Sequence, residues 1–172
     1  MSVKQKEIND AITLHRTKIH ENRIEALKVF QKYKVSYWLA IYYEKGYGGL
    51  EIDENKALKY YRISTLKGVS NSALKEALLL LKTHKENESD EFNLLITTLI
   101  KKSANYQNID ACYYYGDILL HGKYGNEVDS YIAFKYLEYA ANNGNDKAKE
   151  LIDYREIYNE INNDYTIIYF PK

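Results

Sequence analysis

An internal repeat limits the possible folds of this chain more than any other feature of its sequence. The segment that starts at Val35 and the segment that starts at Ala111 align without a gap, at an offset of 76 residues. The aligned pairs are Tyr37/Tyr113, Gly46/Gly122, Gly49/Gly125, Asp53/Asp129, Ala57/Ala133, Lys59/Lys135, Tyr60/Tyr136 and Gly68/Gly144. Half of this offset is a typical repeat length, so a third unit that has lost its glycines is expected between them, over residues 72–110. The chain is therefore predicted to be an array of repeats.

Each unit has the spacing of two short helices. Its apolar residues recur at intervals of three and four, as on one face of an amphipathic helix. Gly46 and Gly122 stand where a first helix would end in a residue of positive φ. Asp53 and Asp129 stand where a second helix would begin, since a carboxylate there accepts hydrogen bonds from unpaired N–H groups. The pattern predicts helices over residues 4–20, 22–34, 36–45, 54–67, 71–85, 90–105, 109–121, 130–143 and 146–160.

The order of residues in these units resembles the Sel-one-like repeat, a relative of the tetratricopeptide repeat. The first unit carries it in Tyr37, Leu39, Ala40, Tyr43, Gly46, Gly49, Asp53, Lys56, Ala57, Tyr60, Tyr61 and Gly68. The third carries it in Ala111, Tyr113, Gly116, Gly122, Gly125, Asp129, Ala133, Tyr136, Ala140, Ala141, Gly144 and Ala148. The resemblance implies an all-α fold, a short right-handed superhelix (solenoid) of about three repeats with helical caps.

The same resemblance divides the chain into three parts. Residues 1–34 are expected to be a helical cap or partial repeat, and residues 35–148 three repeats with a degenerate middle one. Residues 149–172 would form a capping helix and an extended tail, in which the apolar segment from Asp164 is expected to dock on the last helix or on a partner chain.

The composition argues against several classes of protein. The chain has 172 residues, with 24 Lys and Arg against 24 Asp and Glu, so it lacks the net positive charge of a typical nucleic-acid binder. Its longest aliphatic run, over residues 77–81, is far too short to cross a bilayer, and the N-terminal segment is too polar for a secretory signal. We therefore expect a cytoplasmic protein, a monomer or weak homodimer, that binds neither nucleic acid nor membrane.

The sequence shows no catalytic apparatus. His15 and His20 are five residues apart, about 140° around a helix, so they cannot bind one metal together. Cys112 occupies a small helical site with no histidine at a fixed neighbouring spacing to activate it. The glycines around Gly48 lack the Lys-Ser/Thr pair that follows a phosphate-binding loop. We predict no enzyme activity, metal or cofactor.

The resemblance implies a function in binding, with the first helix of each unit lining a concave groove that takes a protein partner. Three residues at i, i+4 and i+7 of each first helix are expected to share one stripe: Trp38, Tyr42 and Lys45; Lys75, Leu79 and Lys82; Tyr114, Ile118 and His121. We predict that Trp38, Tyr42, Lys45, Lys75, Lys82, Tyr114 and His121 bind the partner, because large aromatic and cationic side chains dominate binding hot spots. In the alternative, these residues are core or inert surface, and Trp38 packs against the leading helices.

The sequence leaves the kind of partner open. Some relatives resemble immunity proteins of secreted bacterial toxins, which makes a bacterial immunity protein that neutralises one toxin or effector the sharper hypothesis. Others are scaffolds, which makes a general adaptor in bacterial signalling or regulation the alternative. A helical repeat that binds RNA or a small molecule is less favoured, because the net charge is zero.

Overall fold

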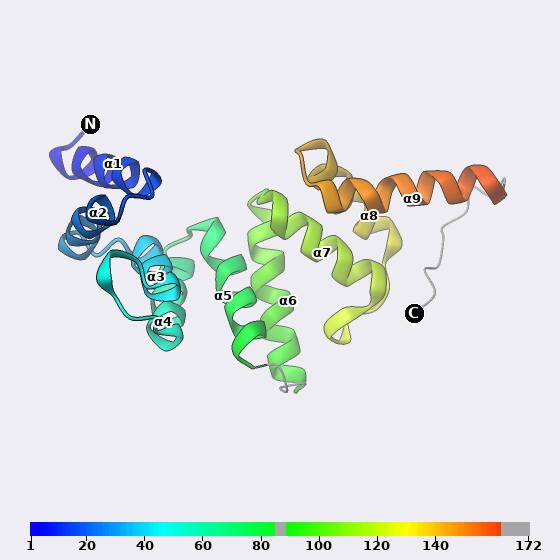
Figure 1. Ribbon diagram of the computed structural model, residues 1–172. Helices are drawn as coiled ribbons and strands as arrows, with labels where there is room; N and C mark the ends of the chain where they lie inside the picture. The colour runs from blue at the N-terminus through cyan, green and yellow to red at the C-terminus, as the bar shows by residue number, and fades with distance from the viewer. Residues whose placement is uncertain (85–88, 163–172) are drawn as a thin grey trace. The chain divides into compact units, whose positions relative to one another are not determined.

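The computed structural model describes residues 1–84 and 89–162, with side chains as far as Arg155 in the last helix (Figure 1). The described residues form nine α-helices, two short 3-10 helices and no strand. The helices are α1 (Val3–Arg16), α2 (His20–Lys32), α3 (Ser36–Lys45), α4 (Glu54–Leu66), α5 (Ser70–Thr83), α6 (Asp90–Asn105), α7 (Ile109–His121), α8 (Ser130–Asn142) and α9 (Asp146–Asn162), with η1 (Tyr47–Gly49) after α3 and η2 (Lys123–Gly125) after α7. All nine predicted helices are confirmed, and the all-α class with them. The tail from Asp164 lies outside the described residues.

The residues predicted to start and stop helices do so. Asp53 accepts a hydrogen bond from the Lys56 backbone N–H at 2.8 Å, and Asp129 accepts one from Ile132 at 2.9 Å, so both are N-caps. Gly46 and Gly122 end α3 and α7 in the left-handed conformation, with φ of 65° and 61°. The two complete repeats therefore begin and end their helices by the same local chemistry.

The turn between consecutive repeats does not require glycine. Gly144 has a φ of 93°, and Gln107, at the matching position of the middle unit, adopts a φ of 59°. In both turns the backbone N–H of the following residue bonds to a carbonyl five residues earlier: Asn145 to Ala140 at 3.0 Å, and Asn108 to Ser103 at 3.3 Å. The hydrogen bonds that close the turn offset the strain of a non-glycine residue there. Lys18 (φ 62°) is also left-handed and lies just beyond α1, which ends four residues earlier than predicted.

The chain divides into two compact units, residues 1–83 and 84–172. In the N-terminal unit α1 packs on α2, α3 on α4, and α4 on α5, while α2 covers η1. In the C-terminal unit α6 packs on α7, α7 on α8, and α8 on α9, while α6 covers η2. The two units therefore share one packing scheme, and the two helices within the predicted middle repeat, α5 and α6, fall in different units.

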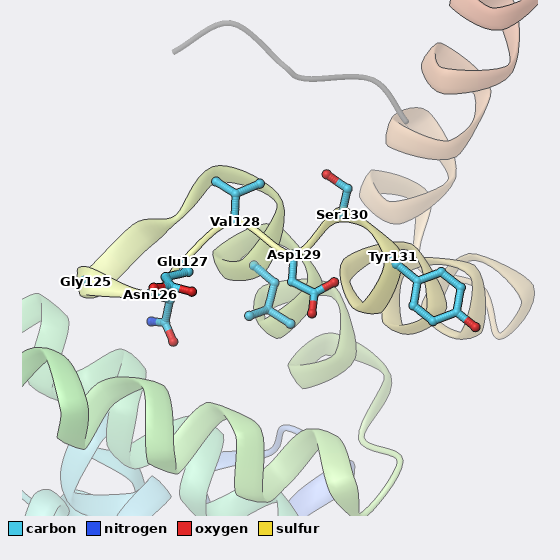
Figure 2. A pocket seen from close by; sticks show the side chains of 8 residues that line it. Gly125, Asn126, Glu127, Val128, Asp129, Ser130 and Tyr131 are labelled. Atoms are coloured by element: carbon cyan, nitrogen blue, oxygen red, sulfur yellow. The ribbon is translucent and has the colours of Figure 1, made fainter. Parts of the chain in front are cut away.

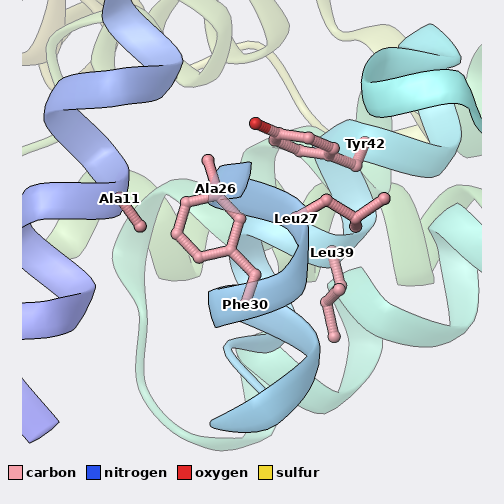
Figure 3. Close-up of a cluster of buried hydrophobic side chains, with 6 residues drawn as sticks. All are labelled: Ala11, Ala26, Leu27, Phe30, Leu39 and Tyr42. Carbon is pink, nitrogen blue, oxygen red and sulfur yellow. The ribbon is translucent and has the colours of Figure 1, made fainter. Parts of the chain in front are cut away.

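The core of the N-terminal unit joins the leading helices to the first complete repeat. Ala11 of α1 and Ala26 and Phe30 of α2 are fully buried together with Tyr42 of α3. Figure 3 shows Ala11 facing Ala26 and Phe30, with Tyr42 reaching over them from α3. The two alanines leave room for the rings, so that α1 and α2 pack closely against α3.

Candidate protein-binding surface

The first helices bury one residue of each predicted stripe. Tyr42, Leu79 and Ile118, the residues at i+4, are 0%, 4% and 2% exposed. Four residues further along a helix, a side chain lies about 40° around the helix axis from the first one. On these three helices, that rotation turns the i+4 side chain towards the core. Tyr42 is therefore a core residue, which corrects its assignment to the partner surface: its ring offers no area for a partner to touch.

The residues at i, i+3 and i+7 remain accessible instead. They are half-buried or exposed on all three helices: Trp38, Ile41 and Lys45 on α3; Lys75, Leu78 and Lys82 on α5; Tyr114, Asp117 and His121 on α7. We call these three sets the outer stripes. Six of the seven residues predicted to bind a partner lie on them. The sequence reasoning missed Ile41, Leu78 and Asp117, which a step of three rather than four would have found.

Trp38 belongs partly to the surface and partly to the core. It is half-buried, its ring stacks on Phe30 with centroids 5.5 Å apart and an interplanar angle of 9°, and it meets the ring of His15 at 4.8 Å. It also meets Tyr37 edge-on at 5.6 Å. The packing against the leading helices, considered as the alternative from the sequence, is therefore real. The same packing holds the accessible part of the indole in a fixed position.

The end of the α3 stripe carries a polar cluster. Tyr61 of α4 donates a hydrogen bond to Glu44 at 2.5 Å, and the Lys45 ammonium pairs with the same carboxylate at 2.5 Å. Burial raises the pKa of Glu44, but the hydrogen bonds from Lys45 and Tyr61 outweigh it and hold the pKa below its ordinary value. Glu44 is therefore charged at neutral pH and steadies Lys45.

The α5 stripe presents lysines. Lys75 is exposed on α5, and its charge contributes to lowering the pKa of Glu44. Lys82 is also exposed but forms an ion pair with Glu54 of α4 at 2.5 Å. Lys45 and Lys75 thus give this part of the N-terminal unit a positive character that one carboxylate, Glu44, only partly offsets.

The α7 stripe combines aromatic rings with an orienting carboxylate. The rings of Tyr113 and Tyr114 lie 5.3 Å apart. Asp117, with a largely buried side chain, contacts His121 Nδ1 at 3.0 Å and the Lys123 ammonium at 2.6 Å. Asp117 thus binds both the His121 imidazole and the Lys123 ammonium, which orders the side chains along this stripe.

The described residues contain no group of three or more His, Cys, Asp or Glu side chains that could hold a metal ion. Cys112 is buried, and burial raises the pKa of its thiol to about 11, so it is a packing residue, as expected. In the part of the chain that the structure describes, no helix has the length and apolar character needed to span a membrane.

A shallow hollow lies on the C-terminal unit. The loop from η2 to the start of α8 lines it, with Gly125, Asn126, Val128, Asp129 and Tyr131 among its residues (Figure 2). Asp129 already caps α8, and Asn126 donates a hydrogen bond to Thr97 at 2.9 Å. The polar groups there hold the loop in place, so the hollow does not bring together groups for chemistry.

Comparison with known proteins identifies the repeats. Residues 35–69 and 109–145 match the Sel1 repeat family. The first stretch contains α3 and α4, and the second contains α7 and α8. Sel1 repeats generally serve as protein–protein interaction modules. No curated protein sequence matches the chain.

Two solved structures share the fold. One is c5321, described as a protective antigen of uropathogenic Escherichia coli strains with an SLR fold: TM-score 0.72, 21% identity, covering 91% of this chain and 34% of that one. The other is a Sel1 repeat protein from Oxalobacter formigenes: TM-score 0.71, 20% identity, covering 85% and 60% of the two chains. The chain spans less than two thirds of either structure, and at this level of identity the likeness concerns the fold alone. The chain thus contains two stretches that match the Sel1 repeat, one in each compact unit, and it shares its fold with solved Sel1-repeat structures.

Proposed function

We propose that the chain is a non-catalytic adaptor that binds one protein partner through its outer stripes. The observation that carries the proposal is the placement of Trp38 and Tyr114. They occupy matching positions on α3 and α7, both are half-buried, and each has a basic side chain seven residues later, Lys45 or His121. Aromatic side chains held in place by packing lose little entropy when they bind, and therefore make effective anchors.

The surroundings of the stripes support this proposal. Glu44 holds Lys45, and Asp117 holds His121 and Lys123, so the charged groups beside each ring are positioned before a partner arrives. Preorganised side chains reduce the entropic cost of association. Tyr42 is excluded from the proposed surface because it is fully buried.

Site-specific photocrosslinking in cells tests the proposal. A photoreactive phenylalanine is placed at position 45, 75 or 114, and in a matched control at position 28, an exposed lysine site on α2. We expect the same protein to be crosslinked from the three stripe positions and not from position 28. Crosslinking of different proteins, or equal crosslinking from position 28, would exclude the proposed surface.

The identity of the crosslinked protein distinguishes an immunity protein from a general adaptor. A secreted toxin as partner, together with protection of a susceptible cell by this chain, makes the protein an immunity protein. Protection should then weaken in a variant that combines Lys45→Glu and Tyr114→Ala, two side chains on the outer stripes. A signalling or regulatory protein as partner makes the chain a general adaptor.

A further inference from the structure

Two arginines lie near the neutral imidazole of His15 in the N-terminal unit. His15 and Arg16 lie in the last turn of α1, and Arg23 lies on α2. The positive charges of Arg23 and Arg16 add to burial in lowering the pKa of His15, so the two guanidinium groups are close enough to His15 to act on it. We call Arg16 and Arg23 the cationic cluster.

Arg23 is held in place without an anionic partner. Its guanidinium carbon lies 3.9 Å from the centroid of the Tyr47 ring, a stacking distance that sets the plane of the group. Its Nε is buried and has no hydrogen-bond partner among the described residues. Because this nitrogen is closed to solvent, an anion from outside could meet Arg23 only at its terminal NH₂ groups.

The carboxylates of the described residues do not neutralise this cluster. The ion pairs that these residues form include neither His15 nor either arginine. The groups that shift the pKa of His15 likewise include no carboxylate. The two arginines therefore have no ion-pair partner among the described residues.

The cluster borders the proposed binding surface. His15 contacts the ring of Trp38 at 4.8 Å, and its Nδ1 lies 3.2 Å from the hydroxyl of Tyr42. The guanidinium of Arg23 stacks on the ring of Tyr47, and the centroid of that ring lies 5.6 Å from the centroid of the His15 imidazole. One continuous set of rings therefore links Trp38 on the outer stripe of α3 to the guanidinium of Arg23.

We propose that the cationic cluster binds a carboxylate side chain from an acidic segment of the partner protein, next to Trp38. This inference rests on the proposed function, since it specifies the chemistry of the partner at that surface. A guanidinium group whose plane is fixed can donate two parallel N–H hydrogen bonds from its terminal nitrogens to one carboxylate. Arg16, the residue after His15, is exposed and adds a second positive charge beside that imidazole.

A titration with a hexaglutamate peptide tests this assignment. The intact chain is labelled with ¹⁵N, and the side-chain Nε–H signals of its arginines are followed by NMR at low salt. We expect the Arg23 signal to shift in a saturable way and the shift to disappear in high salt. Hexalysine should leave the signal unmoved.

Three variants make the test specific. Arg23→Gln and Arg16→Gln should each weaken hexaglutamate binding at least about tenfold, the loss expected when one charge-assisted contact is removed. Lys28→Gln, at an exposed site elsewhere on α2, removes the same charge and should leave binding unchanged. Arg16 is exposed, so its variant remains informative even where Arg23→Gln disturbs the packing on Tyr47.

The outcomes separate this inference from the function it depends on. Equal binding by wild type and Arg16→Gln, or equal weakening in Lys28→Gln, would overturn the cationic cluster as a carboxylate site. Crosslinking from positions 45, 75 and 114 could still succeed in that case, and the proposed adaptor function would stand. If hexaglutamate binds but no partner is crosslinked, the carboxylate site is supported and the proposed adaptor function is rejected.

Discussion

Tyr61 donates a hydrogen bond to Glu44 at 2.5 Å in the N-terminal unit, at positions where the C-terminal unit has two leucines. The matching residues are Leu137 and Leu120, both buried. Tyr61 is also fully buried. The two repeats therefore fill the same place between their helices with a polar pair in one case and an apolar pair in the other.

Removing the hydroxyl of this pair should destabilise the N-terminal unit. Tyr61→Phe leaves the largely buried Glu44 carboxylate without one of its donors, and we expect a loss of about 1–3 kcal/mol in the free energy of unfolding. Urea denaturation at pH 7 measures it. Tyr131→Phe removes a hydroxyl from an exposed ring and should change the free energy very little. Similar losses in both variants would contradict the role of Tyr61.

The same pair should contribute to acid sensitivity. The pKa of Glu44 in the folded protein lies below its ordinary value of 4.5, so its stabilising effect is fully present above that pH. The effect is lost as the pH falls through the lowered pKa. Tyr61→Phe should therefore lose less stability than wild type between pH 5 and pH 3, as urea midpoints over that range would show.

The loss of stability on replacing a turn glycine should depend on which atoms the added side chain would contact. Gly46→Val and Gly122→Val should each cost about 1–2 kcal/mol or more, since both residues are left-handed and an added Cβ would lie 3.0 Å from a backbone oxygen. The sequence predicts a milder effect for Gly48→Ala, because Tyr124 occupies the matching position. In the structure, however, a Cβ at Gly48 would lie 3.1 Å from the Arg23 carbonyl oxygen.

We therefore expect Gly48→Ala to destabilise more than Gly49→Ala. Gly49 also has a positive φ, but an added Cβ there would meet nothing within 4 Å. Thermal midpoints of the two alanine variants make the comparison. A smaller change at Gly48 than at Gly49 would mean that α2 moves away from η1 without penalty.

Gly116 should tolerate no side chain, although the matching residue of the first repeat is Ala40. A Cβ at Gly116 would lie 2.7 Å from Leu137 Cγ and 3.0 Å from the Ala133 carbonyl oxygen. We expect Gly116→Ala to cost about 1–3 kcal/mol through overpacking. Chemical denaturation checks the cause in three variants: Gly116→Ala, Leu137→Ala and the double variant. If Gly116→Ala crowds Leu137, then Leu137→Ala should lower the free energy of unfolding less in the Gly116→Ala protein than in wild type.

His15 should make the N-terminal unit less stable in mild acid. Burial, followed by the charges of Arg23 and Arg16, lowers the pKa of His15 below its ordinary value of 6.5. A lowered pKa means that the unfolded chain binds the proton more readily. The neutral histidine therefore stabilises the fold fully above pH 6.5, and this stabilisation is lost as the pH falls through the lowered pKa.

Replacement by glutamine tests the assignment to His15. Urea midpoints of wild type should fall between pH 7.5 and pH 5, and those of His15→Gln should fall less. His20→Gln serves as the control, since His20 is an exposed histidine on the next helix. An identical pH dependence in wild type and His15→Gln would assign the acid sensitivity to another group.

Local features of the fold were predictable because they depend on residues a few positions apart. The glycines at 46 and 122 and the aspartates at 53 and 129 end and begin helices through contacts within one turn, and all four act as predicted. The turn at Gln107 was predictable only by alignment with Gly144, because glutamine by itself does not indicate a positive φ.

The candidate surface was predictable only in part, because it depends on the direction of neighbouring helices. The spacing of Trp38, Tyr42 and Lys45 suits one helix face, yet α2 covers the side to which Tyr42 turns. The spacing also could not decide whether Trp38 is a surface or a core residue. In the structure it is partly both, since it is half-buried and its ring stacks on Phe30.

The sequence by itself therefore determined the all-α class, the two matching repeats and the residues that cap their helices, because period and capping act over three to five residues. The tertiary structure decided which side of each first helix is buried, since a rotation of about 40° separates an accessible side chain from a core one. The tertiary structure also brings Arg23 into contact with Tyr47 and His15 into contact with Trp38. Those contacts join residues of different helices, and only the packing of α1 and α2 against the first repeat brings them together.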